Sequence, residues 1–145
     1  MLKGFFERHK DFGLLILRIG IGISFFLVHG WPKMMGGPER WEKLGGAMGS
    51  LGIEFAPMFW GFMAAAAEFG GGLLLIFGLF TRTSLAFLAF TMLVAAANHL
   101  SAMDPWGRVF HPIEMMVVFI ALIFLGAGKY SLDALMAKKK TRQII

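Results

Sequence analysis

The sequence predicts an all-α polytopic membrane protein: a bundle of four transmembrane helices with a short interfacial helix in the first outer loop. Hydrophobic residues make up 57% of the 145 residues and charged residues only 16%, and the mean hydropathy is +0.69. Ordinary soluble domains contain about 45–50% apolar and about 25% charged residues. In addition, four apolar stretches reach the roughly 20 residues that a helix needs to cross a bilayer. We assign residues 1–145 to a single transmembrane domain, because a chain of this length has no room for a second one.

The four predicted spans cover about residues 12–35, 57–80, 83–100 and 112–129, and a basic tail, 130–145, follows them. We predict that the second and fourth spans begin at Pro57 and Pro112, because proline is favoured at the first helical position, where its missing N–H costs nothing. The connection between the second and third spans is a very short turn at residues 81–83. This turn predicts that the two helices form an antiparallel hairpin.

The first outer loop, residues 36–56, is the only long connection in the predicted arrangement. Pro38 is placed to begin a short helix that carries Trp41, Leu44 and Met48 on one side. Such a helix is expected to lie on the membrane surface with its apolar side toward the lipid. The alternative is a glycine-rich irregular loop.

The basic residues predict the orientation of the chain. With four spans, both termini and the 81–83 turn share one side of the membrane. That side carries nine basic residues: Lys3, Arg8, Lys10, Arg82, Lys129, Lys138, Lys139, Lys140 and Arg142; the other carries Lys33, Arg40, Lys43 and Arg108. Because lysine and arginine favour the cytoplasmic side, both termini are predicted to be cytoplasmic. This clustering also argues against a nucleic-acid partner, despite the net charge of +5.

A group of polar residues lies at membrane depth. Arg18, His29 and Lys33 share one face of the first span, and charged groups at this depth point into the bundle or a water-filled cavity. Glu68 lies near the middle of the second span. Since Arg18 lies roughly 10 Å deep by helical rise, we predict an Arg18–Glu68 ion pair, which avoids the cost of an isolated buried charge. The alternative is a protonated Glu68.

Further polar residues lie toward the outer half, and with the first group they predict a polar pocket between the helices that opens outward or sideways. The ligand-pocket candidates are Arg18, His29, Lys33, Glu68, Asn98, His99, His111 and Glu114. The alternative is a set of independent structural hydrogen bonds, with Glu114 offsetting a helix dipole. The spacing of these residues matches no metal motif, and the chain contains no cysteine, so we expect no metal and no intrinsic cofactor.

Three stretches resemble the DoxX family: RIGIGISFFLVHGWPK (18–33), AEFGGGLLLIFGLFTR (67–82) and GAGKYSLDAL (126–135). The most specific block is E-x-G-G-x-L-L-L-x-x-G-L-x-T-R. The resemblance implies a small four-helix protein of the prokaryotic inner membrane with a connection to quinones. The polar positions that the family shares map onto Arg18, His29, Lys33, Glu68 and Arg82.

Two functions follow as expectations. The first is a quinone- or lipid-head-group-binding accessory of a membrane redox system, in which His29, Lys33 and Glu68 supply hydrogen-bond donors and a proton route. The second is a non-enzymatic carrier of a small molecule, or an assembly factor of a membrane complex. Whether the chain is an enzyme stays open; if it is, we expect a quinone-linked oxidoreductase subunit with catalytic residues still to be assigned. The expected partners are the lipid bilayer, a quinone or another amphiphile, and a redox subunit or a second copy of the chain.

Overall fold

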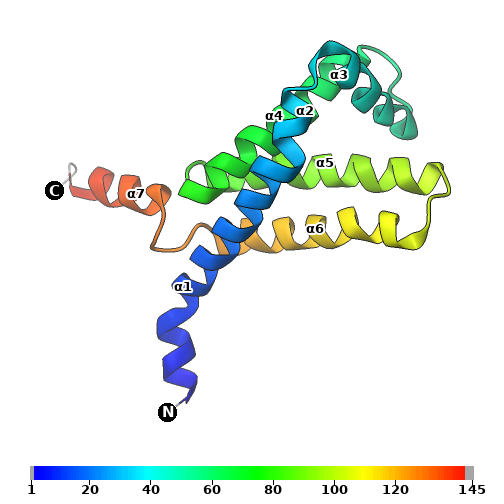
Figure 1. Ribbon diagram of the computed structural model, residues 1–145. Helices are drawn as coiled ribbons and strands as arrows, with labels where there is room; N and C mark the ends of the chain where they lie inside the picture. Colours follow the sequence, from blue (N-terminus) through cyan, green and yellow to red (C-terminus); the bar gives the residue numbers. More distant parts are fainter. Residues whose placement is uncertain (1, 143–145) are drawn as a thin grey trace.

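The computed structural model describes residues 2–142, and within them it consists of helices and connecting turns without strands (Figure 1). The elements in chain order are α1 (Leu2–Ile23), the π-helix η1 (Ser24–Gly30), α2 (Trp31–Met34), α3 (Gly37–Gly45), the 3₁₀-helix η2 (Gly46–Leu51), α4 (Pro57–Phe77), α5 (Thr81–Ser101), α6 (Trp106–Leu125) and α7 (Leu132–Arg142). The first three elements follow one another without a break and form one long, locally widened helix.

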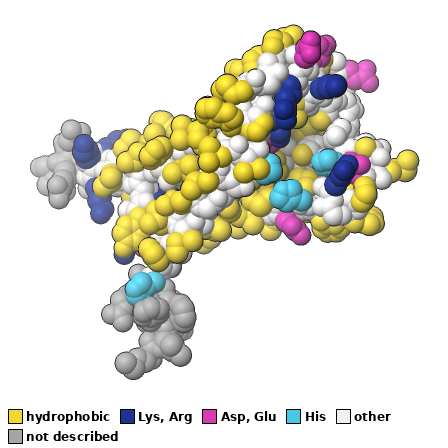
Figure 2. Space-filling model, in the orientation of Figure 1, with side chains coloured by type: hydrophobic (Ala, Val, Ile, Leu, Met, Phe, Trp, Pro, Cys, Tyr) yellow, Lys and Arg dark blue, Asp and Glu magenta, His cyan; other side chains and the backbone are white. Residues whose placement is uncertain are grey.

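Four helices are long and apolar enough to cross a membrane, which confirms the predicted fold class. They cover His9–Met34, Pro57–Phe77, Thr81–Ser101 and Trp106–Leu125. In Figure 1, α5 and α6 run side by side, and α1, which packs against α4, crosses them in this view; the start of α1 and α7 lie away from the α5–α6 connection. Large apolar side chains cover much of the outer surface in Figure 2, and Phe124, for example, is 81% exposed. Such a surface suits hydrocarbon rather than water.

Two predicted boundaries are wrong. The turn of the α4–α5 hairpin lies at Gly78–Phe80 rather than at 81–83, because Gly78 and Phe80 take left-handed backbone angles (φ 64° and 47°) and α5 already begins at Thr81. The fourth span begins at Trp106, directly after Pro105, so Pro112 lies inside the helix instead of at its first position. The prediction placed the start too late because the polar residues between Pro105 and Pro112 lower the local hydropathy. The helix can nevertheless include Pro112, since membrane helices tolerate an internal proline.

The predicted short helix in the outer loop is confirmed as α3, with a proline in its first turn. It folds back onto α4, and glycine makes the close approach possible. A Cβ atom at Gly45 would lie 1.7 Å from the Pro57 carbonyl oxygen, and one at Gly61 would lie 1.7 Å from the Trp41 carbonyl oxygen. The Trp41 ring packs against Phe62, with ring centroids 5.0 Å apart. The apolar side of α3 therefore faces protein, and its location at the membrane surface stays a prediction.

The contact between the first span and α4 also depends on glycine. Gly72 faces the backbone of η1, and a Cβ atom there would lie 2.6 Å from the Phe26 nitrogen and 3.0 Å from the Gly22 carbonyl oxygen. Gly30 approaches α4 in the same way, since its Cβ would lie 2.4 Å from the Phe69 Cα. Helices in membranes commonly associate through small residues that let their backbones approach. This contact fixes the register between the two helices.

We therefore expect Gly72→Val to lower the stability of the folded chain by about 1–3 kcal/mol or more, because the rigid backbone of η1 must move away. Gly70→Val is the matched control, since a Cβ at Gly70 meets nothing within 4 Å. Thermal unfolding of both variants in detergent provides the measurement. Equal melting temperatures for the two variants would contradict the close packing of η1 on α4.

Candidate functional site

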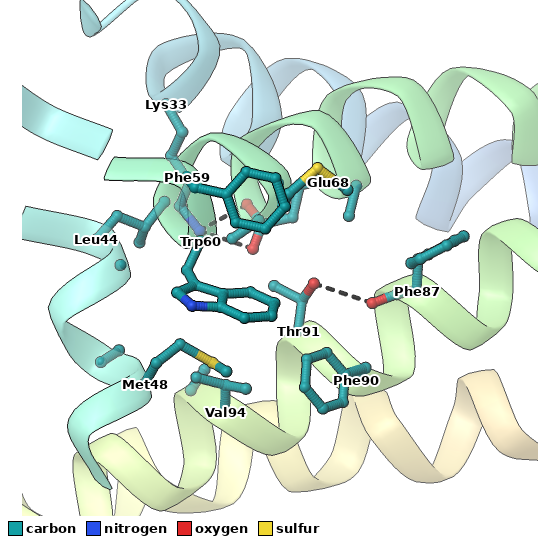
Figure 3. Close-up of a pocket in the computed structure, with 16 residues that line it drawn as sticks. Lys33, Leu44, Met48, Phe59, Trp60, Glu68, Phe87, Phe90, Thr91 and Val94 are labelled. Carbon is teal, nitrogen blue, oxygen red and sulfur yellow. Dashed lines mark hydrogen bonds and ion pairs between the residues drawn. The ribbon is translucent and has the colours of Figure 1, made fainter. Parts of the chain in front are cut away.

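A cavity of about 230 Å³ lies between the α3–η2 segment, α4 and α5 (Figure 3). Its walls are mainly apolar, and aromatic rings contribute much of the surface: Phe59, Trp60, Phe87 and Phe90. Lys33 and Glu68 are the charged residues of the lining. An apolar cleft with a few convergent polar groups is the usual form of a small-molecule site.

The two charged residues form an ion pair. The Lys33 Nζ lies 2.7 Å from Oε1 and 2.6 Å from Oε2 of Glu68, and it directs its hydrogen bond to Oε1. The Glu68 side chain is only 1% exposed, whereas the Lys33 side chain is 24% exposed. The close approach of Gly30 to the α4 backbone brings the end of the first span directly over Glu68. Lysine therefore neutralises a carboxylate that would otherwise be buried without a partner charge.

The predicted Arg18–Glu68 pair is wrong, since the partner of Glu68 is Lys33. The fully buried Arg18 donates from Nη1 to the Leu75 and Ile76 carbonyl oxygens, at 3.1 and 3.4 Å, and from Nη2 to the Tyr130 carbonyl oxygen. The last carbonyls of a helix have no partner within it and carry the negative end of its dipole. The end of α4 and the Tyr130 carbonyl thus bind both Nη groups without a carboxylate, whereas the buried Nε has no hydrogen-bond partner among the described residues.

Arg18 belongs to a structural junction where the C-terminal segment meets the α4–α5 turn. The Asp133 carboxylate accepts hydrogen bonds from the Phe80 and Thr81 backbone N–H groups, each at 2.9 Å, and so caps the start of α5. The Asp133 N–H donates to the Gly78 carbonyl oxygen at 2.9 Å. A Cβ at Gly78 would lie 2.2 Å from the Arg18 Nη1, so this glycine supplies space as well as its backbone angle. The sequence analysis missed Asp133, because this carboxylate caps a helix that begins 52 residues earlier in the chain, and no local pattern marks such a cap.

The pKa of the Asp133 carboxyl lies below its usual value. Partial burial raises this pKa, but the backbone hydrogen bonds from Thr81 and Phe80 and the positive charge of Arg18 lower it by more. A carboxyl whose pKa is lower in the folded state stabilises the fold above its unfolded pKa of about 3.9. This stabilisation is lost as the pH falls through the lowered, folded pKa.

We expect Asp133→Asn to destabilise the chain by about 1 kcal/mol at pH 7, because the amide keeps one acceptor oxygen but loses the charge and one of the two hydrogen bonds. Below the folded pKa both side chains are neutral, so the difference in stability between wild type and variant should shrink. Thermal unfolding of the two proteins across the acid range measures it. A difference that stays constant from neutral to strongly acidic pH would exclude the charged cap.

The remaining sequence-predicted residues lie outside the cavity lining. The His29 ring lies against Phe25, with centroids 5.0 Å apart, and 6.1 Å from the His111 ring. His99 Nδ1 lies 2.7 Å from Asp104 Oδ2 in the α5–α6 connection. Of the eight candidates, Lys33 and Glu68 line the cavity, while Arg18, His29, Asn98, His99, His111 and Glu114 do not. Ligand contact by any of the eight stays a prediction.

Across the described residues, no group of three or more histidine, aspartate or glutamate side chains is placed to hold a metal ion. Figure 2 shows histidine side chains near basic and acidic ones over one end of the molecule, but they are distributed between separate contacts. His29 with His111, and His99 with Asp104, are pairs rather than one ligand set.

The sequence reading missed the aromatic wall, and Trp60 is its most informative member. The indole Nε1 of Trp60 is buried and, among the described residues, has no hydrogen-bond partner. Glu68 Oε2 also lacks a hydrogen bond of its own within the described chain, although the lysine ammonium lies beside it. Buried polar atoms are normally satisfied, so the unpartnered indole N–H of this cavity-lining residue suits a ligand that carries an acceptor group.

Comparison with known proteins finds a matching family and relatives that are similar over most of the chain. The model of the DoxX family matches residues 13–100. The chain is similar to the inner membrane protein YqjF of Escherichia coli, with 33% identity over 138 residues, covering 92% of this chain and 98% of the relative. It is 30% identical to the Escherichia coli inner membrane protein YphA over 141 residues, covering 87% and 96%. It is 32% identical over 134 residues, covering 92% and 94%, to the Bacillus subtilis protein named "Putative oxidoreductase CatD". No solved structure matches the chain.

Proposed function

The chain belongs to the DoxX family of membrane proteins, and from this premise we propose that it binds the polar head of a quinone-like amphiphile beside Lys33 and Glu68, as an accessory of a membrane redox system. Its four apolar helices and its inner-membrane relatives make it a multi-pass protein of the inner membrane, in contact with the lipid bilayer. The cytoplasmic location of both termini stays a prediction.

The observation that carries the proposal is the ion pair at one end of an otherwise apolar, aromatic cavity. A quinone ring has two carbonyl oxygens that accept hydrogen bonds, and its reduced form has two hydroxyl groups that donate them. The Lys33 ammonium is a suitable donor and the Glu68 carboxylate a suitable acceptor. The unpartnered Trp60 Nε1 provides a second donor.

The apolar part of the cavity suits the ring itself. The aromatic side chains Phe59, Trp60 and Phe90 present ring surfaces, which favour stacked or edge-to-face contacts with another π-system. The name of the Bacillus subtilis relative supports a redox setting. Since the chain has no cysteine to carry electrons, a partner subunit would supply them in this account.

Two measurements test the proposal. Protein purified from its native membrane is expected to contain a quinone that appears in the ultraviolet spectrum and in mass spectrometry of the lipid extract. Binding of a decyl-benzoquinone to the purified chain is expected to weaken at least about tenfold in Glu68→Gln, the loss of roughly one charge-assisted hydrogen bond. Glu114→Gln is the matched control, because Glu114 is exposed and lies outside the cavity lining. Equal affinity of wild type and Glu68→Gln would contradict the proposal.

A further inference from the structure

A second cavity, of about 330 Å³, lies along the same side of the α4–α5 hairpin as the first. The two cavities share three lining residues, Met63, Ala67 and Phe87. Apart from Thr83 and Ser84, the lining of the second cavity is apolar and carries no charge. We call the two cavities together the α4–α5 groove.

The α4–α5 groove is long and has one polar end. On α4 the lining runs from Phe59 to Leu74, and along α5 and the turn before it from Phe80 to Ala95. Fifteen residue steps in a helix rise about 22 Å, a large part of the roughly 30 Å hydrocarbon core of a bilayer. The charged residues of the lining, Lys33 and Glu68, belong to the first cavity, so the remainder of the groove is suited to hydrocarbon.

Small residues leave this space open. Ala66 and Gly70 line the second cavity on α4, where larger side chains would occupy its volume. The residues at its edges are exposed: Met63 by 37%, Phe80 by 61% and Phe87 by 51%. Because these apolar side chains face outward from a membrane-spanning hairpin, the groove opens sideways toward lipid rather than toward water.

We propose that the second cavity binds a single long apolar tail, belonging to the amphiphile whose head lies beside Lys33 and Glu68. The inference rests on the proposed function and specifies its ligand class: a compact polar head joined to one linear hydrocarbon or isoprenoid chain. The position of this cavity beside the head-group cavity argues for the occupant, since the two cavities share Met63, Ala67 and Phe87 as lining residues. An isoprenoid quinone and a single-chain lipid share this chemistry. Their tail would enter between α4 and α5 from the bilayer.

Gly70 offers a direct way to test the tail site. It lines the second cavity but not the first, and a Cβ atom there meets nothing within 4 Å. Gly70→Leu therefore fills the groove without forcing any backbone to move. Gly20→Leu is the matched control: Gly20 also lies in a span, its Cβ meets nothing within 4 Å, and it lines neither cavity.

The experiment compares three probes by calorimetric titration of the purified full chain in detergent: a tailless benzoquinone, the same ring with a decyl tail, and lysophosphatidylglycerol. Wild type and Gly20→Leu are expected to bind the decyl compound at least about tenfold more tightly than the tailless ring, the effect of burying about two methylene groups. Gly70→Leu is expected to lose about tenfold in affinity for the decyl compound and to keep the wild-type affinity for the tailless ring.

The outcomes separate the tail site from the head site. If Gly70→Leu binds the decyl compound as tightly as wild type does, the tail site is overturned. The tail site is also overturned if the decyl tail adds no affinity in wild type, but the proposed function then stands. Binding of lysophosphatidylglycerol alone, weakened by Gly70→Leu, supports the tail site and overturns the quinone head. If wild type binds none of the three probes, both proposals fail.

Discussion

Removing one partner of the Lys33–Glu68 pair is expected to destabilise the chain by about 3–5 kcal/mol, because it leaves the other charge buried without a partner. Glu68→Leu leaves the ammonium against an apolar wall, and Lys33→Met leaves a carboxylate that is 99% shielded from solvent, since its side chain is only 1% exposed. The double variant Lys33→Met/Glu68→Leu replaces both charges with apolar groups and is expected to recover most of the lost stability.

Chemical or thermal unfolding of the four proteins in detergent forms a double-mutant cycle, and binding of a decyl-benzoquinone provides the second measurement. The double variant is expected to be stable but unable to bind, since both head-group contacts are gone. Additive destabilisation in the cycle would contradict direct pairing, because residues without contact show little coupling. If the double variant binds the quinone as tightly as wild type does, Lys33 and Glu68 do not contribute to the binding site.

The second large effect is expected at Arg18. Arg18→Met removes all three hydrogen bonds to the Leu75, Ile76 and Tyr130 carbonyl oxygens. Hydrogen bonds to charged groups contribute about 1.5–3 kcal/mol each, so the variant is expected to lose at least about 3 kcal/mol of stability. The loss should also loosen the C-terminal segment around Tyr130, although Asp133 still holds it to the α4–α5 turn, and limited proteolysis near Tyr130 can detect this loosening.

The Arg18 variant distinguishes the observed arrangement from an Arg18–Glu68 pair. Arg18→Met and Glu68→Leu are expected to destabilise the chain additively, because each residue has its own partner in a different part of the bundle. Rescue of Arg18→Met by Glu68→Leu would show that the two side chains interact. Arg82→Met provides a comparison, since Arg82 donates a single hydrogen bond within the described residues, to the Ile123 carbonyl oxygen at 3.1 Å, and this variant should lose less stability.

The spans could be predicted because the signal is physical and local: each is a long run of apolar residues. The start of the fourth span could not, because the helix continues through Pro112 into a polar turn. The polar residues of that turn lower its mean hydropathy, so the turn is not recognised as part of the span. The backbone can nevertheless continue as a helix through the proline. The short helix α3 could be predicted from Pro38, but its packing on α4 depends on Gly45 and Gly61, which meet only in the folded chain.

The candidate site could be predicted only in part. Lys33 and Glu68 stood out as charges within apolar segments, and both line the cavity. Their pairing was missed for two reasons. First, η1 is a π-helix, so the side chains beyond Ser24 do not follow the regular helical period that places Arg18 and Lys33 on one face. Second, the prediction considered only carboxylates as partners for a positive charge, whereas the partners of Arg18 are backbone carbonyl oxygens.

The cavity walls could not be read from the sequence. Trp60, Phe90 and the small residues of α4 look like ordinary membrane-facing or packing residues until α3, α4 and α5 are placed around one space. Arg82 illustrates the same limit: it belongs to the most specific block of the sequence, yet its described contact is with the end of α6. A shared polar position is thus compatible with a role in holding the helices together.

The position of the bound head group tests the central claim most directly. A photoreactive azidoquinone with a decyl tail, irradiated with the purified chain and followed by peptide mass spectrometry, would report the residues beside the ring. The account predicts labelling on residues 59–68 of α4 or 87–95 of α5, which line the cavity at the Lys33–Glu68 pair, and loss of that label in Glu68→Gln. Labelling concentrated on the segments around His29, His99 and His111, unaffected by Glu68→Gln, would contradict it.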